Sequence, residues 1–414
     1  EKIENLNNYV VLNNKFNLLK MKWNYDNYIK WKNKGCPINL DVLELDISRR
    51  NITSLEGINN LTNLKELWCE NNQIKSLEGI NNLKFLQKLY CYNNQIQSLI
   101  PTNNLTNLTE LYCQTNQITS LEGINNLTNL RKLDCYHNQI RSLEPIKKLI
   151  NLQELGCGEN KIQSLKPIKK LINLRELHCS DCQIQSLQPL KKLKFLQILS
   201  CLNNQIQSLK PLKNLINLQE LLCGENQIKS LEYIYNLTNL QTLHCFENQI
   251  TSLEGINNCN LLKDIACSSN QISSLEPIKK LINLQELCCR NNKIQSLKPI
   301  KNLINLQELS CHHNQIQSLE SIKNLINLQK LCCHHNQIQS LERINNLINL
   351  RRLDCSHNEI QSLEPIMNLI NLTYVNYSNN PIEYIPPNIV RKLNQIKNHQ
   401  NIYNDNQNVH NHNI

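Results

Sequence analysis

A repeat of 22 residues is the feature that most constrains how this chain can fold. One unit reads L-x-x-L-x-C-x-x-N-x-I-x-S-L-x-x-I-x-x-L over 64–83, and the pattern recurs in register from Val42 to the unit that begins at Leu372. A fixed period of this kind is typical of a solenoid, in which each unit packs only against its neighbours. The 414 residues therefore predict one elongated repeat domain of about sixteen units, rather than two or three globular domains.

The spacing within a unit predicts the local structure. Leu67 and Cys69 are two residues apart, so on a strand both side chains point to the same side, which we expect to be the core. Beyond the asparagine, Ile74, Leu77 and Ile80 recur at intervals of three, which favours a 3-10 or short helical turn. Strands stacked side by side would line a concave face, and the turns would line a convex one.

This pattern resembles the leucine-rich repeat, in the 22-residue class found in bacterial internalins and in a regulatory subunit of a eukaryotic protein phosphatase. The resemblance covers residues 42–385. It implies an α/β repeat fold: a leucine-rich-repeat solenoid with a curved parallel sheet on the concave face and 3-10 or short helical turns on the convex face. It also implies a ladder of inward-turned asparagines that bond backbone groups. Arg50 and Cys182 interrupt that ladder, and we expect Cys182 to be a local weak point.

The Asn-, Ile- and Lys-rich composition and the near-identical units also resemble leucine-rich-repeat proteins of amoeba-infecting giant viruses. This second resemblance implies that the partner is a host protein.

Fourteen of the nineteen cysteines occupy one position of the repeat: Cys69, Cys91, Cys113, Cys135, Cys157, Cys179, Cys201, Cys223, Cys245, Cys267, Cys289, Cys311, Cys333 and Cys355. A free cysteine behaves as a small buried apolar residue. Such a series of thiols suits a reducing compartment and predicts a cytoplasmic location. No apolar run is long enough to predict a membrane span.

Both ends of the chain depart from the repeat. We expect residues 1–41 to form a helical cap over the first unit, since the ends of a solenoid need covering; a separate binding module is the alternative. Residues 386–397 predict a cap helix that begins near Pro387. The Asn- and His-rich residues 398–414 predict a disordered tail.

Aromatic residues gather at variable positions of the early units. We expect five of them to share one exposed surface that binds a partner: Trp68, Tyr90, Tyr92, Tyr112 and Tyr136. Exposed tyrosine and tryptophan are enriched at binding hot spots. The alternative is that cross-strand stacking of these rings only stabilises the sheet.

Histidines and cysteines gather in the late units, where the phrase CHHN occurs twice. His312, Cys332 and His334 would supply three ligands to a zinc ion. Their spacing matches no known metal signature, so a duplicated, solvated segment is the alternative. A third interpretation is a pH-sensitive patch, because stacked histidines repel one another once they are protonated.

Motifs of catalysis are missing from the sequence, which has no P-loop, no G-x-S-x-G and no H-E-x-x-H. We therefore expect a monomeric, non-enzymatic module without a cofactor, which binds another protein on its concave face. The formal charge of +10 and the lysines of the convex turns, such as Lys147 and Lys169, leave open a nucleic acid or an anionic surface as the ligand. That ridge lacks the interleaved aromatics that stack on bases, so we do not expect nucleic acid to be the partner.

Overall fold

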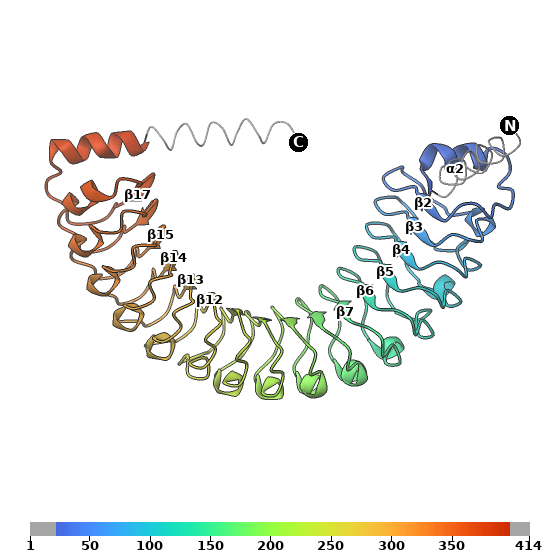
Figure 1. Cartoon of the computed structure of the whole chain (residues 1–414), viewed down its shortest axis with the longest axis horizontal. Helices are drawn as coiled ribbons and strands as arrows, with labels where there is room; N and C mark the ends of the chain where they lie inside the picture. The colour runs from blue at the N-terminus through green and yellow to red at the C-terminus, as the bar shows by residue number, and fades with distance from the viewer. Residues whose placement is uncertain (1–21, 398–414) are drawn as a thin grey trace, which may run out of the picture. The chain divides into compact units, whose positions relative to one another are not determined.

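The computed structural model describes residues 22–397 and divides the chain into two compact units, residues 1–205 and 206–414. Both units are built from the same element, a three-residue strand followed by a turn. Figure 1 shows the strands on the inner side of each unit and the turns on its outer side.

The first unit contains nine parallel strands that pair in chain order. Each strand pairs with the residues 22 positions further along, so that Leu45 lies opposite Leu67 and Leu67 opposite Leu89. The strands are β1 Lys22–Trp23, β2 Glu44–Asp46, β3 Glu66–Trp68, β4 Lys88–Tyr90, β5 Glu110–Tyr112, β6 Lys132–Asp134, β7 Glu154–Gly156, β8 Glu176–His178 and β9 Ile198–Ser200.

Short 3-10 helices connect several strands of the first unit: η1 Ile58–Asn60, η2 Ile100–Thr102, η3 Glu144–Ile146, η4 Lys166–Lys170 and η5 Gln188–Lys192. Proline stands in the first turn of η2 to η5. A proline there costs nothing, because the first amide of a helix has no partner within it.

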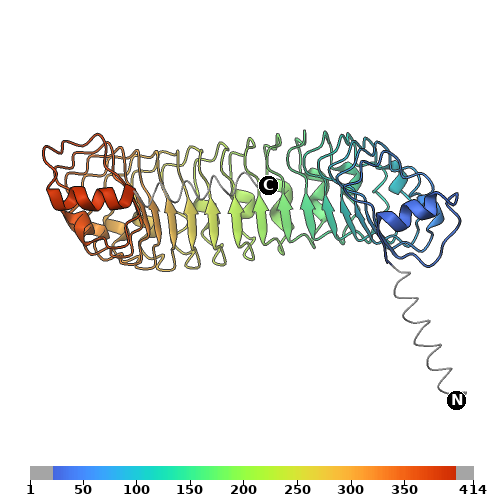
Figure 2. The same cartoon turned by 90° about the horizontal axis from the view of Figure 1, so that it is seen from above.

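The second unit repeats this design with eight parallel strands, which stand side by side in Figure 2. They are β10 Glu220–Leu222, β11 Thr242–His244, β12 Asp264–Ala266, β13 Glu286–Cys288, β14 Glu308–Ser310, β15 Lys330–Cys332, β16 Arg352–Asp354 and β17 Tyr374–Asn376. The turns are η6 Lys210–Leu212, η7 Glu232–Ile234, η8 Glu276–Ile278, η9 Lys298–Ile300, η10 Glu320–Ile322, η11 Glu342–Ile344 and η12 Glu364–Asn368. The predicted repeat fold of parallel strands and 3-10 turns is therefore confirmed.

The core of both units consists of the apolar positions of the repeat. Leu67, Cys69, Ile74, Leu77 and Ile80 are fully buried, and their equivalents are buried in the later repeats as far as Ile366. All fourteen cysteines of the repeat position are free thiols with no exposed surface. Each buried aliphatic side chain contributes about 1.5–3 kcal/mol by leaving water.

Asparagines satisfy the backbone where each strand ends. The buried Asn116 accepts a hydrogen bond from the amide of Ile96 at 2.9 Å and donates to the carbonyls of Cys91 and Cys113, both at 3.1 Å. The same contacts recur at most asparagines of this position, from Asn72 to Asn380. Each bond removes a penalty of about 1–3 kcal/mol for a buried group without a partner.

Cys182 replaces the asparagine of this ladder in one unit of the N-terminal half. Its Sγ donates to the carbonyl of Cys157 across 3.6 Å. Sulfur is a weak donor and acceptor, so this contact is poorer than an amide pair. Thr102 marks another departure, because it takes a position that isoleucine or leucine fills in the other repeats. Its buried hydroxyl donates to the carbonyl of Leu99 at 2.8 Å, which keeps the polar group bonded.

A strand and a helix lie at the N-terminal end. Strand β1 pairs with β2, so Trp23 lies opposite Leu45. Helix α2, Tyr25–Lys32, begins with a capping box at Asn24 and buries Tyr28 and Trp31. The sequence predicted helices here but not β1, which is too short to show a periodicity. Residues 1–21, the larger part of the predicted 1–41 cap, lie outside the described residues.

A helix over residues 387–397 lies at the C-terminal end. It buries Ile389, Leu393 and Ile396, and Lys392 donates to the carbonyls of Met367 and Leu369 at 2.9 and 3.0 Å. The predicted tail, residues 398–414, lies outside the described residues. Among residues 22–397, no helix has the length and apolarity needed to cross a bilayer.

Candidate functional site

Three aromatic rings form a continuous stack on the solvent-facing surface of the sheet in the first unit. Trp68, Tyr90 and Tyr112 end strands β3, β4 and β5 and are paired in register. The Trp68 and Tyr90 ring centroids lie 5.6 Å apart with planes 5° from parallel, and those of Tyr90 and Tyr112 lie 4.9 Å apart at 4°. These three side chains, called the aromatic stack below, are half-buried, so part of each ring faces solvent.

The stack arises from the repeat itself. In the sequence, each aromatic residue stands between a buried leucine and a buried cysteine of the same repeat. The alternation of side chains along a strand therefore points all three rings toward solvent. Neighbouring rings then meet as cross-strand pairs, which stabilise a sheet by about 0.2–1 kcal/mol each. Lys22 extends the row, since its Nζ lies 5.0 Å from the centre of the Trp68 ring.

Tyr136 lies apart from the aromatic stack. It is exposed, its hydroxyl donates to the Glu159 carboxylate, and the only ring contact described for it is with His137. Tyr92 occupies the next row, one position after the buried cysteine, and is half-buried. The structure thus groups three of the five predicted residues in one stack, while Tyr92 and Tyr136 belong to the next row and do not join it.

Two unpaired acceptors occupy the row that contains Tyr92. Oε2 of Glu70 and Oε1 of Gln114 are buried and have no hydrogen-bond partner among the described residues. Glu70 lies one repeat before Tyr92, and Gln114 lies one repeat after it. Burial raises the pKa of the Glu70 carboxyl. Both oxygens are covered by neighbouring residues and carry the cost of a buried acceptor without a partner.

The tyrosines of the stack remain neutral donors. The Tyr112 hydroxyl donates to Oε2 of Glu110 at 3.2 Å. Burial, followed by the neighbouring Glu110 carboxylate, raises the pKa of Tyr112, and the same two causes raise the pKa of Tyr90. Both hydroxyls therefore keep their protons at neutral pH, and the proton of Tyr112 is already donated to Glu110.

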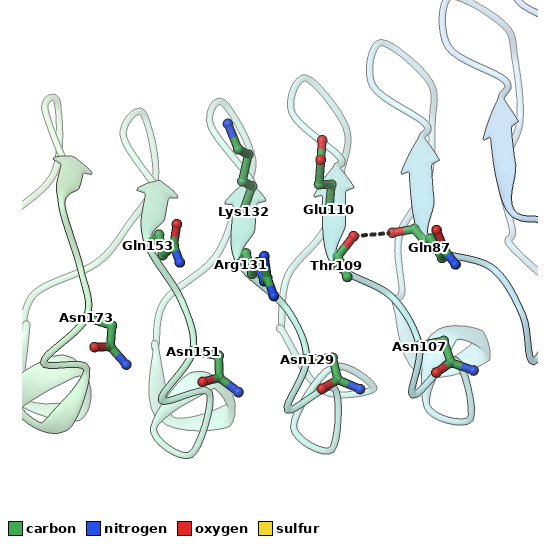
Figure 3. Close-up of a pocket in the computed structure, with 10 residues that line it drawn as sticks. All are labelled: Gln87, Asn107, Thr109, Glu110, Asn129, Arg131, Lys132, Asn151, Gln153 and Asn173. Atoms are coloured by element: carbon green, nitrogen blue, oxygen red, sulfur yellow. Dashed lines mark hydrogen bonds between the residues drawn. The ribbon is translucent and has the colours of Figure 1, made fainter.

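A polar groove adjoins the aromatic stack, with a volume of about 720 Å³. Figure 3 shows its lining, which consists of Gln87, Asn107, Thr109, Glu110, Asn129, Arg131, Lys132, Asn151, Gln153 and Asn173. Glu110 belongs to both features, because it lines the groove and accepts from Tyr112. Lys132 pairs with Glu154 at 2.7 Å.

Sequence reasoning missed this groove. Asn107, Asn129, Asn151 and Asn173 hold one position of the repeat and looked like scaffold. In the structure each side-chain amide donates to a carbonyl of the preceding unit, as Asn107 does to Lys84 at 2.8 Å. The row of amides along the groove follows from that regularity, and their 22-residue spacing was the available signal.

Five histidines of the second unit form two stacked rows. In the first, the rings of His312 and His334 lie 4.1 Å apart. In the second, His335 lies between His313, at 4.2 Å, and His357, at 4.0 Å. Burial, followed by the neighbouring His334, lowers the pKa of His312 to about 4; burial is also the first cause that lowers the pKa of His334 and His335.

The predicted metal ligands His312, Cys332 and His334 are not the group whose ligand atoms come together. Among the described residues, the ligand atoms of His313, His334 and His335 lie within 4.8 Å of one another. Cys332 is half-buried, and burial raises the pKa of its thiol. The ligand set expected from the sequence did not include His313 or His335.

The lysines of the turns are partly neutralised by acids of the same turn. Lys147 pairs with Glu144 at 3.0 Å, and Lys323 pairs with Glu320 at 2.7 Å. Lys279 and Glu276 form the same kind of pair. These contacts lower the net positive charge that the ridge presents to a polyanion.

Comparisons with known proteins agree with this architecture. The family model described as Leucine Rich repeats (2 copies) matches residues 41–82, 84–126, 128–170, 172–214, 216–266, 238–280, 282–324, 304–347 and 326–368. The comparison with curated proteins found no match.

Three solved structures illustrate the likeness. The LRR protein LIC12759 of Leptospira interrogans is 28% identical, with a TM-score of 0.72 over 89% of this chain and 91% of that one. The internalin InlF of Listeria monocytogenes is 27% identical, with a TM-score of 0.67 over 80% of this chain and 92% of that one. The LRR ectodomain of the receptor kinase GASSHO1/SCHENGEN3 from Arabidopsis thaliana, in complex with CASPARIAN STRIP INTEGRITY FACTOR 2, is 20% identical; its TM-score is 0.58 over 82% of this chain and 50% of that one. The repeat, the parallel strands with 3-10 turns and the matched family model agree, and the chain belongs to the leucine-rich repeat family.

Proposed function

We propose that this chain is a non-enzymatic recognition module that binds a protein through the strand face of its first unit. The observation that carries the proposal is the aromatic stack of Trp68, Tyr90 and Tyr112, whose rings are held parallel and half-exposed. Rigid tyrosine and tryptophan side chains lose little entropy on binding and are the residues most enriched at hot spots.

The surroundings of the stack support a protein ligand over a purely apolar one. The neighbouring groove is lined by amides and by the charges of Glu110, Arg131 and Lys132, so it suits the polar rim of an interface. We expect an apolar or aromatic side chain of the partner to lie on the rings and its polar backbone to lie over the groove.

Family members support the class of ligand. The receptor ectodomain of the same fold was solved in complex with CASPARIAN STRIP INTEGRITY FACTOR 2. For this chain, a host protein is the partner class that the resemblance to giant-virus proteins suggests. The proposal further includes a monomeric state and a reducing, cytoplasmic setting, which the free thiols favour.

Binding can be tested with the full chain as bait in a lysate of candidate host cells. Wild type would be compared with a Trp68→Ala, Tyr90→Ala, Tyr112→Ala variant. The matched control is Tyr384→Ala, which removes an exposed aromatic side chain, 70% accessible, from the second unit. Each captured protein would then be purified and titrated against all three baits, with cross-linking to locate its contact.

We expect a captured partner to bind wild type and the control alike and the triple variant at least about tenfold more weakly, since truncating a hot-spot aromatic costs more than 1 kcal/mol. Cross-links should fall on β3 to β5. Circular dichroism of the triple variant must match wild type. Equal binding by all three baits would contradict the proposal.

A further inference from the structure

We propose that His313, His334 and His335 form a binding site for a divalent transition-metal ion of the zinc class. Their ligand atoms lie within 4.8 Å of one another, and no other cluster of three histidines, cysteines or acids does so in residues 22–397. Three imidazoles with a remaining position for water are a common arrangement around zinc. The site lies in the second unit and is independent of the aromatic stack.

The backbone explains why these three rings meet. His334 and His335 are adjacent, and on a regular strand they would point to opposite sides. His335 instead adopts a left-handed conformation with φ 50°, and His313, one repeat earlier, does the same with φ 52°. This turn brings both rings beside the outward-facing His334, at centroid distances of 5.3 Å in each case.

The geometry needs only a small closure of the side chains. Zinc binds imidazole nitrogen at about 2.0–2.1 Å, so nitrogens in a tetrahedral site lie about 3.3 Å apart. The present limit of 4.8 Å therefore requires a movement of roughly 1.5 Å. His313 and His335 are exposed, so their rings can shift toward an ion without entering the core, whereas His334 is half-buried.

The charges around the cluster also favour a cation. The carboxylate of Asp354, at the end of β16, acts electrostatically on His334 and His335. Hydrogen bonds from Ser356 and Asn376 hold this carboxylate in place, at 2.8 and 3.3 Å. A fixed negative charge beside three imidazole rings stabilises a bound divalent ion.

Cys332 does not belong to the ligand set that we propose. Its thiol is half-buried, and its Sγ is not among the ligand atoms that come together. His312 stacks on His334 at 4.1 Å and orients that ring, so it acts as a positioning residue. The ligand set is therefore three histidines from two neighbouring 22-residue repeats of the second unit.

The test uses the untagged full chain and zinc chloride in isothermal titration calorimetry. Two ligand variants, His334→Gln and His335→Gln, would be compared with two controls. His137→Gln alters the same repeat position as His313 and His335, but its ring contacts Tyr136 and no histidine is described beside it. The triple variant His399→Gln, His410→Gln, His412→Gln removes all three histidines of residues 398–414, which could bind metal themselves.

We expect wild type and both controls to share one site of equal affinity, and each ligand variant to bind at least about tenfold more weakly, as the loss of a metal ligand requires. Cobalt in place of zinc should give a visible spectrum that each ligand variant loses. The proposal is overturned if the ligand variants bind zinc as wild type does, or if the tail variant alone abolishes binding. Thermal unfolding without metal would show that all variants fold.

Discussion

Tyr90 lies parallel to Tyr112, with ring planes 4° apart and centroids separated by 4.9 Å. The two residues are 22 positions apart in the sequence and directly opposite each other on β4 and β5. The same pair of rings therefore contributes to the stability of the sheet and to the surface that we propose for binding. The two contributions can be measured separately.

For stability, a double-mutant cycle of Tyr90→Leu and Tyr112→Leu should give a coupling free energy of about 0.5–1.5 kcal/mol, as aromatic pairs do. Leucine keeps an apolar side chain while it removes the stacking. Urea unfolding followed by circular dichroism would measure the four free energies. A coupling free energy near zero would mean that the parallel rings contribute nothing to the sheet.

We expect Cys182→Asn to raise the free energy of unfolding by about 1–2 kcal/mol, because it restores the side-chain hydrogen bonds that the other asparagines of the ladder make. The matched control is Asn204→Cys in the following repeat, where Asn204 is buried and donates to Cys179 and Cys201. That change should lower stability by a similar amount. Urea titration of both variants checks the pair, and a destabilising Cys182→Asn would contradict the role that we assign to the ladder.

The thiols should divide into two classes in the native protein. Cys36, Cys182, Cys288 and Cys332 are half-buried, and the other fifteen of the nineteen are buried. Thiolate is the reactive form, and burial disfavours it, as when burial raises the pKa of Cys223 to about 12. Iodoacetamide followed by mass spectrometry should label the four first and the rest only after denaturation. Early labelling of the fully buried Cys245 would be inconsistent with this packing.

Asp134 should make stability depend on pH. Burial raises the pKa of its carboxyl in the folded protein, while a hydrogen bond from the Tyr136 amide opposes that shift. A raised folded-state pKa gives a stabilising contribution that is present below the unfolded-state pKa and is lost as the pH rises through the folded-state value. Asp134→Asn keeps the shape and removes the charge, so it should be more stable than wild type at pH 7.

Thermal unfolding of wild type and Asp134→Asn at pH 7 and pH 3 would measure this effect. The difference should disappear at pH 3, where the wild-type carboxyl is protonated in both states. Asp46→Asn is the control, because Asp46 holds the same repeat position but is exposed. A gain that persists unchanged at pH 3 would rule out the charge as its cause.

The repeat made the fold predictable, since the period of 22 residues states which positions face the core in every unit. Departures from the repeat were harder to read. Strand β1, Lys22–Trp23, has two residues and no periodicity, and only its pairing with β2 reveals it. The groove beside the aromatic stack was also missed, because each of its asparagines looks like scaffold until the units are stacked.

The sequence alone determined the repeat fold, the buried cysteines and the outward direction of Trp68, Tyr90 and Tyr112, because a strict two-residue alternation along each strand decides which side chains point inward. The tertiary structure decided which outward side chains meet. It separated Tyr136 from the aromatic stack and brought His313 and His335 to His334. For the histidines the physical reason is the left-handed backbone of His313 and His335, which turns each side chain by an amount that spacing along the sequence does not reveal. Tyr136 lies apart because it follows the buried cysteine of its repeat, whereas the three stacked rings precede theirs.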